Sequence, residues 1–342
     1  ILFKPNGKLV KAGERFKNPN FANYLEQIIV EGSNFLYRGD LTDKIDDFMG
    51  DGGLLTKGDF LNYEVIERTP LKFDFNGKTI ITNPMPSPGG TLIAFALKII
   101  SQNFPGEKID NRLLTLGMRL AQTARSEIIS GKNGTGSLAE ILSPSYFKKY
   151  SDLFDSEISL KPNKNKPGSG STTHMSIIDS QGNAASVTTT NGEGCGYIIP
   201  GTGIMMNNIL GEEDLNPDGF HNWETTKRME TMMSPTIVIG DFGPELVLGS
   251  GGSNRIRSAI KQVIVNKFIK NMNLEEAIQA PRIHLEDNII HCESGINTAK
   301  LIFPWSTIYH WHEKNLFFGG VNAVTPTNAV GDPRRSGYGL VR

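Results

Sequence analysis

The sequence predicts a mixed fold of helices and strands, either α/β or α+β. Long segments with apolar residues at helical spacing occur at 91–104 and 111–129. Short runs typical of strands occur in both halves, for example at 71–75 and 234–240. The chain has 342 residues, which is enough for a large core and, by length alone, for about two domains.

The first 60 residues favour helices and loops. Apolar residues fall on one helix face over 20–30, and a second short helix is expected over 41–49 before the glycine at position 50. Thr56 is a candidate N-cap for a third helix. Strands are then expected at 63–66, 71–75 and 79–82, and Asn76-Gly77 is a two-residue hairpin signal.

The middle of the chain changes abruptly from loop to strand. Residues 161–169 hold three lysines and two prolines with almost no apolar residue, which predicts a mobile loop. Directly afterwards an alternating strand begins near Thr172, residues 180–183 form a turn, and 184–190 predict the second strand of a hairpin. A hydroxyl at the start of a strand, just after an exposed loop, suits a nucleophile at a newly formed chain end.

The remaining elements continue the mixed pattern. A strand at 245–248 runs into a glycine-rich turn at 249–254, and a helix is expected from there to about residue 271. A short helix at 274–280 and strands at 289–292 and 317–324 complete the prediction.

Composition excludes several classes of function. The net charge of −1 gives no overall field for nucleic acid or an anionic membrane, and no apolar run is long enough to span a bilayer. Two cysteines, Cys195 and Cys292, do not make a disulfide framework. His310 and His312 have no further Cys or His cluster nearby, so a zinc site is not expected there. The sequence as a whole implies no metal and no organic cofactor.

Thr172 is the main candidate for nucleophilic chemistry. A threonine hydroxyl is a weak nucleophile unless a base takes its proton. If the Ser171–Thr172 bond breaks, Thr172 gains an α-amine with a pKa of about 8, which can act as that base. The alternative, which the local sequence leaves open, is that Thr172 has a structural role only and begins a strand because of its β propensity.

The turn at 249–256 is the second candidate. Glycines between a strand and a helix present backbone N–H groups near a helix N-terminus, and such groups can stabilise a developing oxyanion. A dinucleotide fingerprint is less well supported, because Asn254 stands where the third glycine belongs. A plain tight turn remains open from the sequence.

Several short motifs follow one another along nearly the whole chain. They are Gly52 to Thr56 with Asp59, Pro84 to Gly90, Thr172-Thr173-His174 with Gly182-Asn183-Ala184, Gly203 to Asn208, Met233 to Thr236, Gly249 to Ile256, Ala280-Pro281-Arg282 and Asp332 to Arg335. In this order they resemble the γ-glutamyltranspeptidase family.

The resemblance implies an N-terminal-nucleophile hydrolase with a four-layer αββα sandwich, in which residues 1–171 are the C-terminal part of the large subunit and 172–342 the small catalytic subunit released by self-cleavage. It also implies that the first part of the large subunit, with its carboxylate-binding arginine, is missing from this chain.

The resemblance assigns roles to individual residues. It makes Thr172 the nucleophile and Thr190, 18 residues later, the threonine that hydrogen-bonds to it. The oxyanion glycines are Gly251 and Gly252 if the Gly-Gly pair itself is matched, whereas strict counting gives Gly252 and Ser253. Met233 and Ser234 fall in a substrate-binding segment.

The substrate-binding positions depart from the family pattern. The usual Asn after the second threonine comes one position early, as Asn191, and Glu193 follows it. Glu212 could replace the family's aspartate, and the usual Ser-Ser pair is Thr231-Met232. Glu212 and Glu193 are therefore the candidates for holding a substrate ammonium.

The resemblance implies a γ-glutamyltransferase or glutathione hydrolase. It would pass a γ-glutamyl group from glutathione or another small γ-glutamyl amide to water or an amine. Its expected partners are this substrate and the two subunits of one precursor. A same-fold amidase or β-lactam acylase, and a non-catalytic binding relative, are the alternatives. Family analogy favours a periplasmic or secreted protein and leaves a cytoplasmic one open.

Overall fold

The computed structural model describes most of the chain in two compact units. The described residues are 4, 7–11, 13–50, 53–106, 108–129, 138–153, 171–212, 215–216, 219–222 and 227–342. One unit comprises Ile1–Arg68 with Gly194–Asn208, and the other comprises Thr69–Glu193 with Ile209–Arg342. The predicted mobile loop at 161–169 and the glycine at position 52 lie outside the described residues.

The first unit is helical, as predicted. Asn18 caps its first helix by accepting the Phe21 N–H, and Thr56 and Asp59 form a capping box at the last one. Tyr24, Leu41, Ile45 and Ile199 form its small buried core. Its helices are α1 (Pro19–Glu31), α2 (Asn34–Tyr37), α3 (Asp40–Met49) and α4 (Lys57–Leu61).

The second unit is built on a six-stranded sheet of order β1-β2-β5-β6-β10-β11, all of whose pairs are antiparallel. Asn76 and Gly77 both have positive φ, which is the geometry of the predicted hairpin turn. The strands are β1 (Leu71–Phe75), β2 (Lys78–Thr82), β5 (Thr236–Gly240), β6 (Gly243–Gly251), β10 (Gly320–Val324) and β11 (Ala329–Val330).

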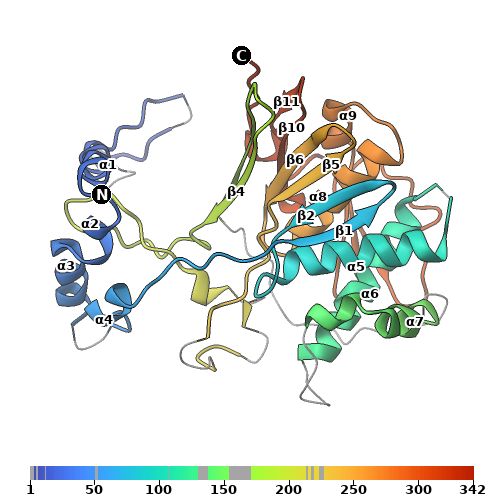
Figure 1. Ribbon diagram of the computed structural model, residues 1–342, viewed down its shortest axis with the longest axis horizontal. Coiled ribbons are helices and arrows are strands. Elements are labelled where there is room, and N and C mark those ends of the chain that lie inside the picture. Colours follow the sequence, from blue (N-terminus) through green and yellow to red (C-terminus); the bar gives the residue numbers. More distant parts are fainter. Residues whose placement is uncertain are drawn as a thin grey trace. The chain divides into compact units, whose positions relative to one another are not determined.

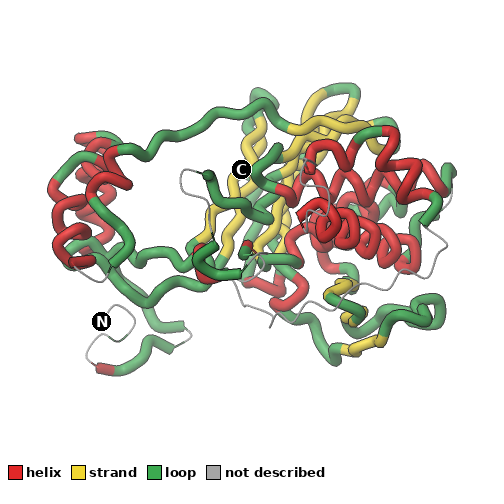
Figure 2. The backbone as a smooth tube through the Cα atoms, turned by 90° about the horizontal axis from the view of Figure 1, so that it is seen from below, coloured by secondary structure: helices red, strands yellow, loops and turns green. Residues whose placement is uncertain are grey.

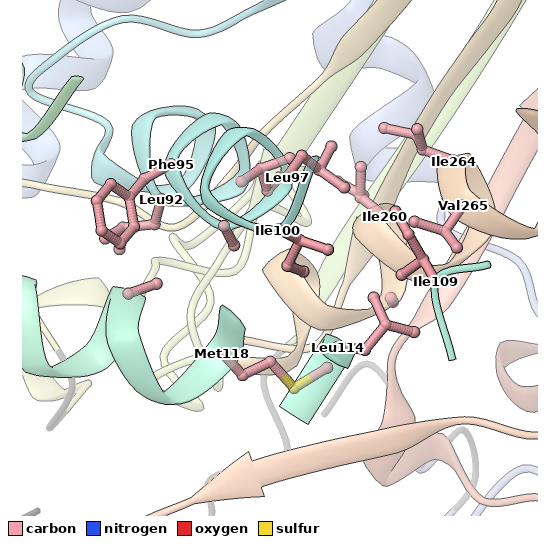
Figure 3. Packing of buried hydrophobic residues seen from close by; sticks show 14 of the residues in the cluster. Leu92, Phe95, Leu97, Ile100, Ile109, Leu114, Met118, Ile260, Ile264 and Val265 are labelled. Atoms are coloured by element: carbon pink, nitrogen blue, oxygen red, sulfur yellow. The ribbon is translucent and has the colours of Figure 1, made fainter. Parts of the chain in front are cut away.

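Helices cover one face of this sheet (Figures 1 and 2). Leu246 and Leu248 on β6 join the same buried cluster as the apolar side chains of α5 and α8. Figure 3 shows this packing, with Leu97 and Ile100 of α5 near Ile260 of α8. The helices are α5 (Pro88–Asn103), α6 (Asn111–Ile129), α7 (Pro144–Ser151), α8 (Arg255–Phe268) and α9 (Leu274–Gln279), with 3-10 turns at Leu138–Leu142, Ile209–Gly211, Leu316–Phe318 and Pro333–Arg335.

A hairpin of β3 (Thr172–Ile178) and β4 (Ala184–Thr190) packs against the other side of β6 and β10. Its inner face is polar, whereas Met175, Ile177 and Val187 on its outer face are exposed. The described residues thus form a helix layer, a sheet and a hairpin. This agrees with the predicted mixed α+β class, and the outer helix layer of an αββα sandwich stays a prediction.

Some predicted elements were wrong or missing. Residues 63–66 form no strand, and the side chains of Tyr63, Val65 and Ile66 are exposed. A small sheet of β7 (Ile283–Glu286), β8 (Ile289–Cys292) and β9 (Thr307–His310) contains two strands that the sequence pattern did not indicate. Among the described residues, no helix is long and apolar enough to cross a membrane.

Candidate active site

The β3–β4 hairpin brings two threonine hydroxyls together. Thr172 and Thr190 are directly opposite in the antiparallel register, and their Oγ1 atoms are 3.0 Å apart. Either hydroxyl can donate in this pair. Thr190 Oγ1 also accepts the Gly192 N–H at 3.0 Å, which fixes its position. Spacing along the chain could not show this pairing, because it depends on the hairpin register.

Glycines on β6 allow the hairpin to lie unusually close. A Cβ added to Gly251 would lie 2.3 Å from the Thr172 carbonyl oxygen and 3.3 Å from Thr172 Cβ. A Cβ added to Gly249 would lie 2.3 Å from the His174 ring. Both distances are too short for real side chains, so this sheet face must carry glycine at alternate positions. Gly251 is therefore in direct contact with the predicted nucleophile.

The turn after Gly251 presents unpaired backbone donors. Gly252 has φ +121° and Ser253 has φ +49°, both in the left-handed region, before Arg255 begins α8. Within the described part of the chain, no hydrogen bond uses the N–H groups of Gly252 or Ser253. Successive N–H groups in such a turn can hold an anion. The two unpaired N–H groups, those of Gly252 and Ser253, can serve as an oxyanion site, and the alternative pair of Gly251 and Gly252 stays a prediction.

His174 is buried two residues after Thr172, and its role was missed by sequence reasoning. Its Nδ1 lies 2.8 Å from Thr188 Oγ1 and its Nε2 lies 2.8 Å from Ser176 Oγ. Ser176 Oγ donates to the Asn322 carbonyl at 3.1 Å, so we infer that Nε2–H donates to Ser176. Burial lowers the pKa of His174 to about 4. The ring is thus neutral with both nitrogens occupied, which suits an anchor rather than a general base.

Asn322 on β10 links β3 to a buried ion network. Its side-chain amide donates to the His174 carbonyl at 2.9 Å and accepts the Asp332 N–H at 3.2 Å. Asp332 in turn pairs with Arg282 at 2.6 Å and with Arg334 at 3.3 Å. The segments 280–282 and 332–335, which resemble the family, are therefore linked to the hairpin through Asn322. The alternation of polar residues at 172, 174 and 176 was the signal that could have indicated this buried polar face.

The ion network is fully buried. Arg334 also pairs with Glu293 at 2.5 Å, so two arginines and two carboxylates compensate each other. Burial would raise the pKa of Asp332, but Arg282 and Arg334 outweigh it and hold the pKa below its ordinary value.

The predicted substrate-binding carboxylates lie on loops, one after β4 and one after the 3-10 turn Ile209–Gly211. Glu193 is exposed and lies just beyond Gly192, whose carbonyl accepts the Ser171 N–H. Glu212 follows the 3-10 turn Ile209–Gly211, and its carbonyl accepts the Asn216 amide at 2.7 Å. Among the described residues, the Oγ1 atoms of Thr172 and Thr190 are hydrogen-bonded to each other and, for Thr190, to the Gly192 N–H. Their proposed role with a substrate ammonium remains a prediction.

Ser234 and Met233 lie in a segment fixed by the 84–90 loop. Ser234 is fully buried, and its hydroxyl donates to the Met232 carbonyl at 2.9 Å. The Met233 carbonyl accepts from Ser87 at 2.7 Å. Met232 itself belongs to the apolar core. The hydroxyl-bearing pair expected from the family pattern is thus replaced by one partly buried threonine and one core methionine.

The described residues contain no cluster of three or more His, Cys, Asp or Glu side chains that could hold a metal. Cys195 is exposed and Cys292 is buried, and both are free thiols.

Comparison with known proteins places these features in a family. The model of the Gamma-glutamyltranspeptidase family matches residues 1–341. The chain is 30% identical over 309 residues to the glutathione hydrolase proenzyme of Escherichia coli, covering 83% of this chain and 53% of that protein. It is also 30% identical over 310 residues to the acylase ACY 1 proenzyme of Pseudomonas sp. strain SE83, covering 87% and 55%. The chain thus spans about half the length of these relatives.

Solved structures give the same fold. The cephalosporin acylase from Bacillus halodurans superposes with a TM-score of 0.80 at 21% identity, over 99% of this chain and 65% of that one. At this identity the likeness concerns the fold alone.

Proposed function

Because this chain belongs to the γ-glutamyltranspeptidase family, we propose that it is part of an acyl-transfer enzyme whose nucleophile is Thr172. The main observation in support is that Thr172 contacts both the Thr190 hydroxyl and Gly251. Its hydroxyl lies 3.0 Å from that of Thr190, and its backbone is packed on Gly251. A nucleophile, an orienting hydroxyl and adjacent backbone donors are the parts that acyl transfer requires.

We propose that the nucleophile is released by self-cleavage. Thr172 Oγ1 attacks the Ser171 carbonyl carbon, the C–N bond breaks, and an ester and a free Thr172 amine form. Water then hydrolyses the ester, leaving a carboxylate on Ser171 and restoring the hydroxyl. The Ser171 N–H donates to the Gly192 carbonyl, which supports this step because it restrains the peptide beside the attacking group. The curated relatives are named proenzymes.

The same groups then support turnover. The neutral α-amine of Thr172 takes the proton of its own hydroxyl, and Oγ1 attacks the substrate amide. The N–H groups near Gly251, Gly252 and Ser253 stabilise the oxyanion. The amine proton passes to the leaving group, and an acyl-enzyme remains. Water or an acceptor amine then takes the acyl group. Thr190 orients Thr172 throughout.

We propose a γ-glutamyl amide such as glutathione as the acyl donor, with Glu212 and Glu193 as candidates for its ammonium. Relatives named glutathione hydrolase support this substrate. An acylase with a different acyl group is the second candidate. It is favoured by Met232 in the core and by Ser234, whose hydroxyl is turned to the main chain. Relatives named acylase also support it.

The first experiment is an intact-mass time course on the full-length gene product. We expect two fragments, one beginning at Thr172, and no cleavage of Thr172→Ala. Thr173→Ala is the matched control, because Thr173 is the neighbouring threonine but lies on the exposed face of β3; it should cleave like the wild type. A well-folded wild-type chain that stays intact would contradict the self-processing proposal, and the chain would then be interpreted as a non-catalytic relative.

The second experiment separates the two acyl donors. Hydrolysis of a γ-glutamyl anilide is compared with that of a glutaryl anilide, which lacks the α-amine. A γ-glutamyl enzyme should show a clearly higher kcat/KM for the first compound, and Glu212→Gln or Glu193→Gln should reduce the difference. Equal kcat/KM values would mean that the ammonium is not recognised, and the acylase proposal would replace the γ-glutamyl one.

A further inference from the structure

A small cavity lies beside α8 in the second unit. Ser258 and Lys261 on α8 and His284 on β7 contribute to its polar wall. Apolar side chains complete the wall, among them Leu92 and Met118, which are shown in Figure 3. The centre of a water-sized sphere can occupy about 10 Å³ of it, a region about 2.7 Å across if it is spherical. The two oxygens of a carboxylate are about 2.2 Å apart, so a single group of that size fits.

Lys261 is buried beside this cavity without a counter-ion. It is 3% exposed, and its amine has no hydrogen-bond or ion-pair partner among the residues described. The carboxylate of Glu286 lies 4.0 Å from His284 Nε2 and does not line the cavity. A buried ammonium without a partner is costly, so this position favours the neutral amine.

Arg257, one helical turn before Lys261, also lines the cavity and disfavours the ammonium. Burial and the charge of Arg257 lower the pKa of Lys261 from 10.5 to about 7. Arg257 has further interactions of its own, and its repulsion of Lys261 acts beside them. At pH 7 about half of Lys261 is therefore neutral, whereas on the order of one in 3,000 ordinary lysines is neutral. Only the neutral amine is a nucleophile, so Lys261 is far more reactive than an exposed lysine.

The wall of the cavity offers hydrogen-bond donors. Ser258 Oγ lies 2.8 Å from His284 Nδ1 and 3.6 Å from Met118 Sδ, which is the weaker acceptor. Ser258 therefore donates to Nδ1, and burial keeps the ring neutral by lowering its pKa well below 6.5. The ring proton is then on Nε2, which has no hydrogen-bond partner among the described residues. This N–H and the Arg257 guanidinium are suited to hold a negative group.

We propose that Lys261 is a site of reversible carbamylation by carbon dioxide. The lone pair of the neutral Nζ forms a bond to the carbon of CO₂, and one C=O π pair moves to oxygen. The nitrogen then loses one proton to solvent, which leaves a carbamate with a single negative charge. The reaction replaces a cation that Arg257 repels with an anion that Arg257 attracts and the His284 N–H can contact. The alternative is an unmodified Lys261 with water in the cavity.

The first test is ¹³C NMR of the full-length gene product in buffer with ¹³C-labelled bicarbonate, which supplies dissolved CO₂. We expect a carbamate signal, separate from those of bicarbonate and CO₂, that is lost in Lys261→Met. Lys300→Met is the control and should keep the signal, because the Lys300 side chain is 77% exposed. Terminal α-amines also form carbamates, and their signals should be the same in all three proteins. A wild type with no signal beyond those of Lys261→Met would overturn the proposal.

Crystallography of the wild type decides the case if Lys261→Met does not fold. Crystals of the full-length gene product are compared in bicarbonate and in buffer purged of CO₂. We expect planar density continuous with Nζ of Lys261 in the first and a bare amine in the second. A bare amine in both, with water or an ion in the cavity, would overturn the proposal. The same adduct in both would also overturn it, because a carbamate loses its CO₂ when the gas is removed.

Discussion

Thr172 and His174 are neighbours on one face of β3, yet Thr172 is available for chemistry whereas His174 is suited to anchoring the strand. The Thr172 hydroxyl is paired with one other hydroxyl and adjoins a turn with unpaired N–H groups, so it can take part in chemistry. Both ring nitrogens of His174 are already occupied, and burial keeps the ring neutral. The difference arises from their partners rather than from their burial, since both are less than a tenth exposed.

His174 predicts a specific pH dependence of stability. Its folded pKa of about 4 lies below the ordinary value of 6.5, so the unfolded chain binds a proton first as pH falls. Stability is therefore complete above pH 6.5, is lost as pH falls toward 4, and loses nothing further below that. The total loss from this residue is about 3 kcal/mol. Urea unfolding at intervals between pH 7 and pH 4 measures it.

His174→Gln separates this effect from the other buried histidines. The variant should start with lower stability at pH 7, because it cannot reproduce both ring contacts. Its stability should then fall less steeply than that of the wild type between pH 6.5 and pH 4. Parallel curves for the two proteins would show that His174 is not the group responsible.

At the scale of elements, the decisive feature is the close packing of the β3–β4 hairpin on β6 and β10. Glycine at 249 and 251 removes the side chains that would separate the two layers, and small polar groups fill the interface. Ser186 Oγ donates to the Leu248 carbonyl at 3.1 Å, and Asn322 joins β3 to β10. The position of Thr172 therefore depends on side-chain-to-backbone hydrogen bonds between layers.

Asn322→Ala tests this dependence. The change leaves the His174 carbonyl and the Asp332 N–H without their partner, and we expect a loss of about 1–3 kcal/mol in the free energy of unfolding. It should also slow self-cleavage, because the strand that carries Thr172 is no longer held. Urea unfolding and the mass time course measure the two effects. Asn328→Ala, in an exposed turn, should change neither; an equal effect there would contradict the role of Asn322.

At the scale of the whole molecule, a buried ion network connects distant parts of the second unit. Arg282 precedes β7, Glu293 follows β8, and Asp332 and Arg334 lie near the C-terminus. Asp332 also accepts the Val321 N–H of β10 at 2.9 Å. Because its charges are paired and hydrogen-bonded, the network holds segments together that the chain order separates widely.

Asp332→Ala should be severely destabilising. It removes the carboxylate that pairs with the buried Arg282 guanidinium and one partner of Arg334, so we expect a loss of about 3–5 kcal/mol. Chemical denaturation of the purified variant measures it. The matched change Asp43→Ala removes an exposed partner of Lys57 and should have little effect. Similar losses in the two variants would contradict the role given to burial.

Local pattern predicted most helices and strands, and family resemblance predicted the threonine pair 18 residues apart. These features were accessible because apolar spacing, caps and turn residues act over a few positions. The strands β7 and β9 were missed because they are four residues each and gain their partners only from a tertiary arrangement. Residues 63–66 have the amino-acid composition of a strand, but the structure forms none there. The prediction was wrong because β propensity alone does not supply the neighbouring strand that a sheet requires.

The sequence by itself determined the mixed fold, the hairpin with Thr172 at its start, and the glycine turn before α8. Only the tertiary structure decided which polar residues share an environment. The 3.0 Å threonine contact, the neutral His174 and the Asn322 link join residues that lie from 2 to 148 positions apart. Hydrogen bonds and charges act over a few ångströms in space, so their partners are set by how strands and helices pack rather than by distance along the chain.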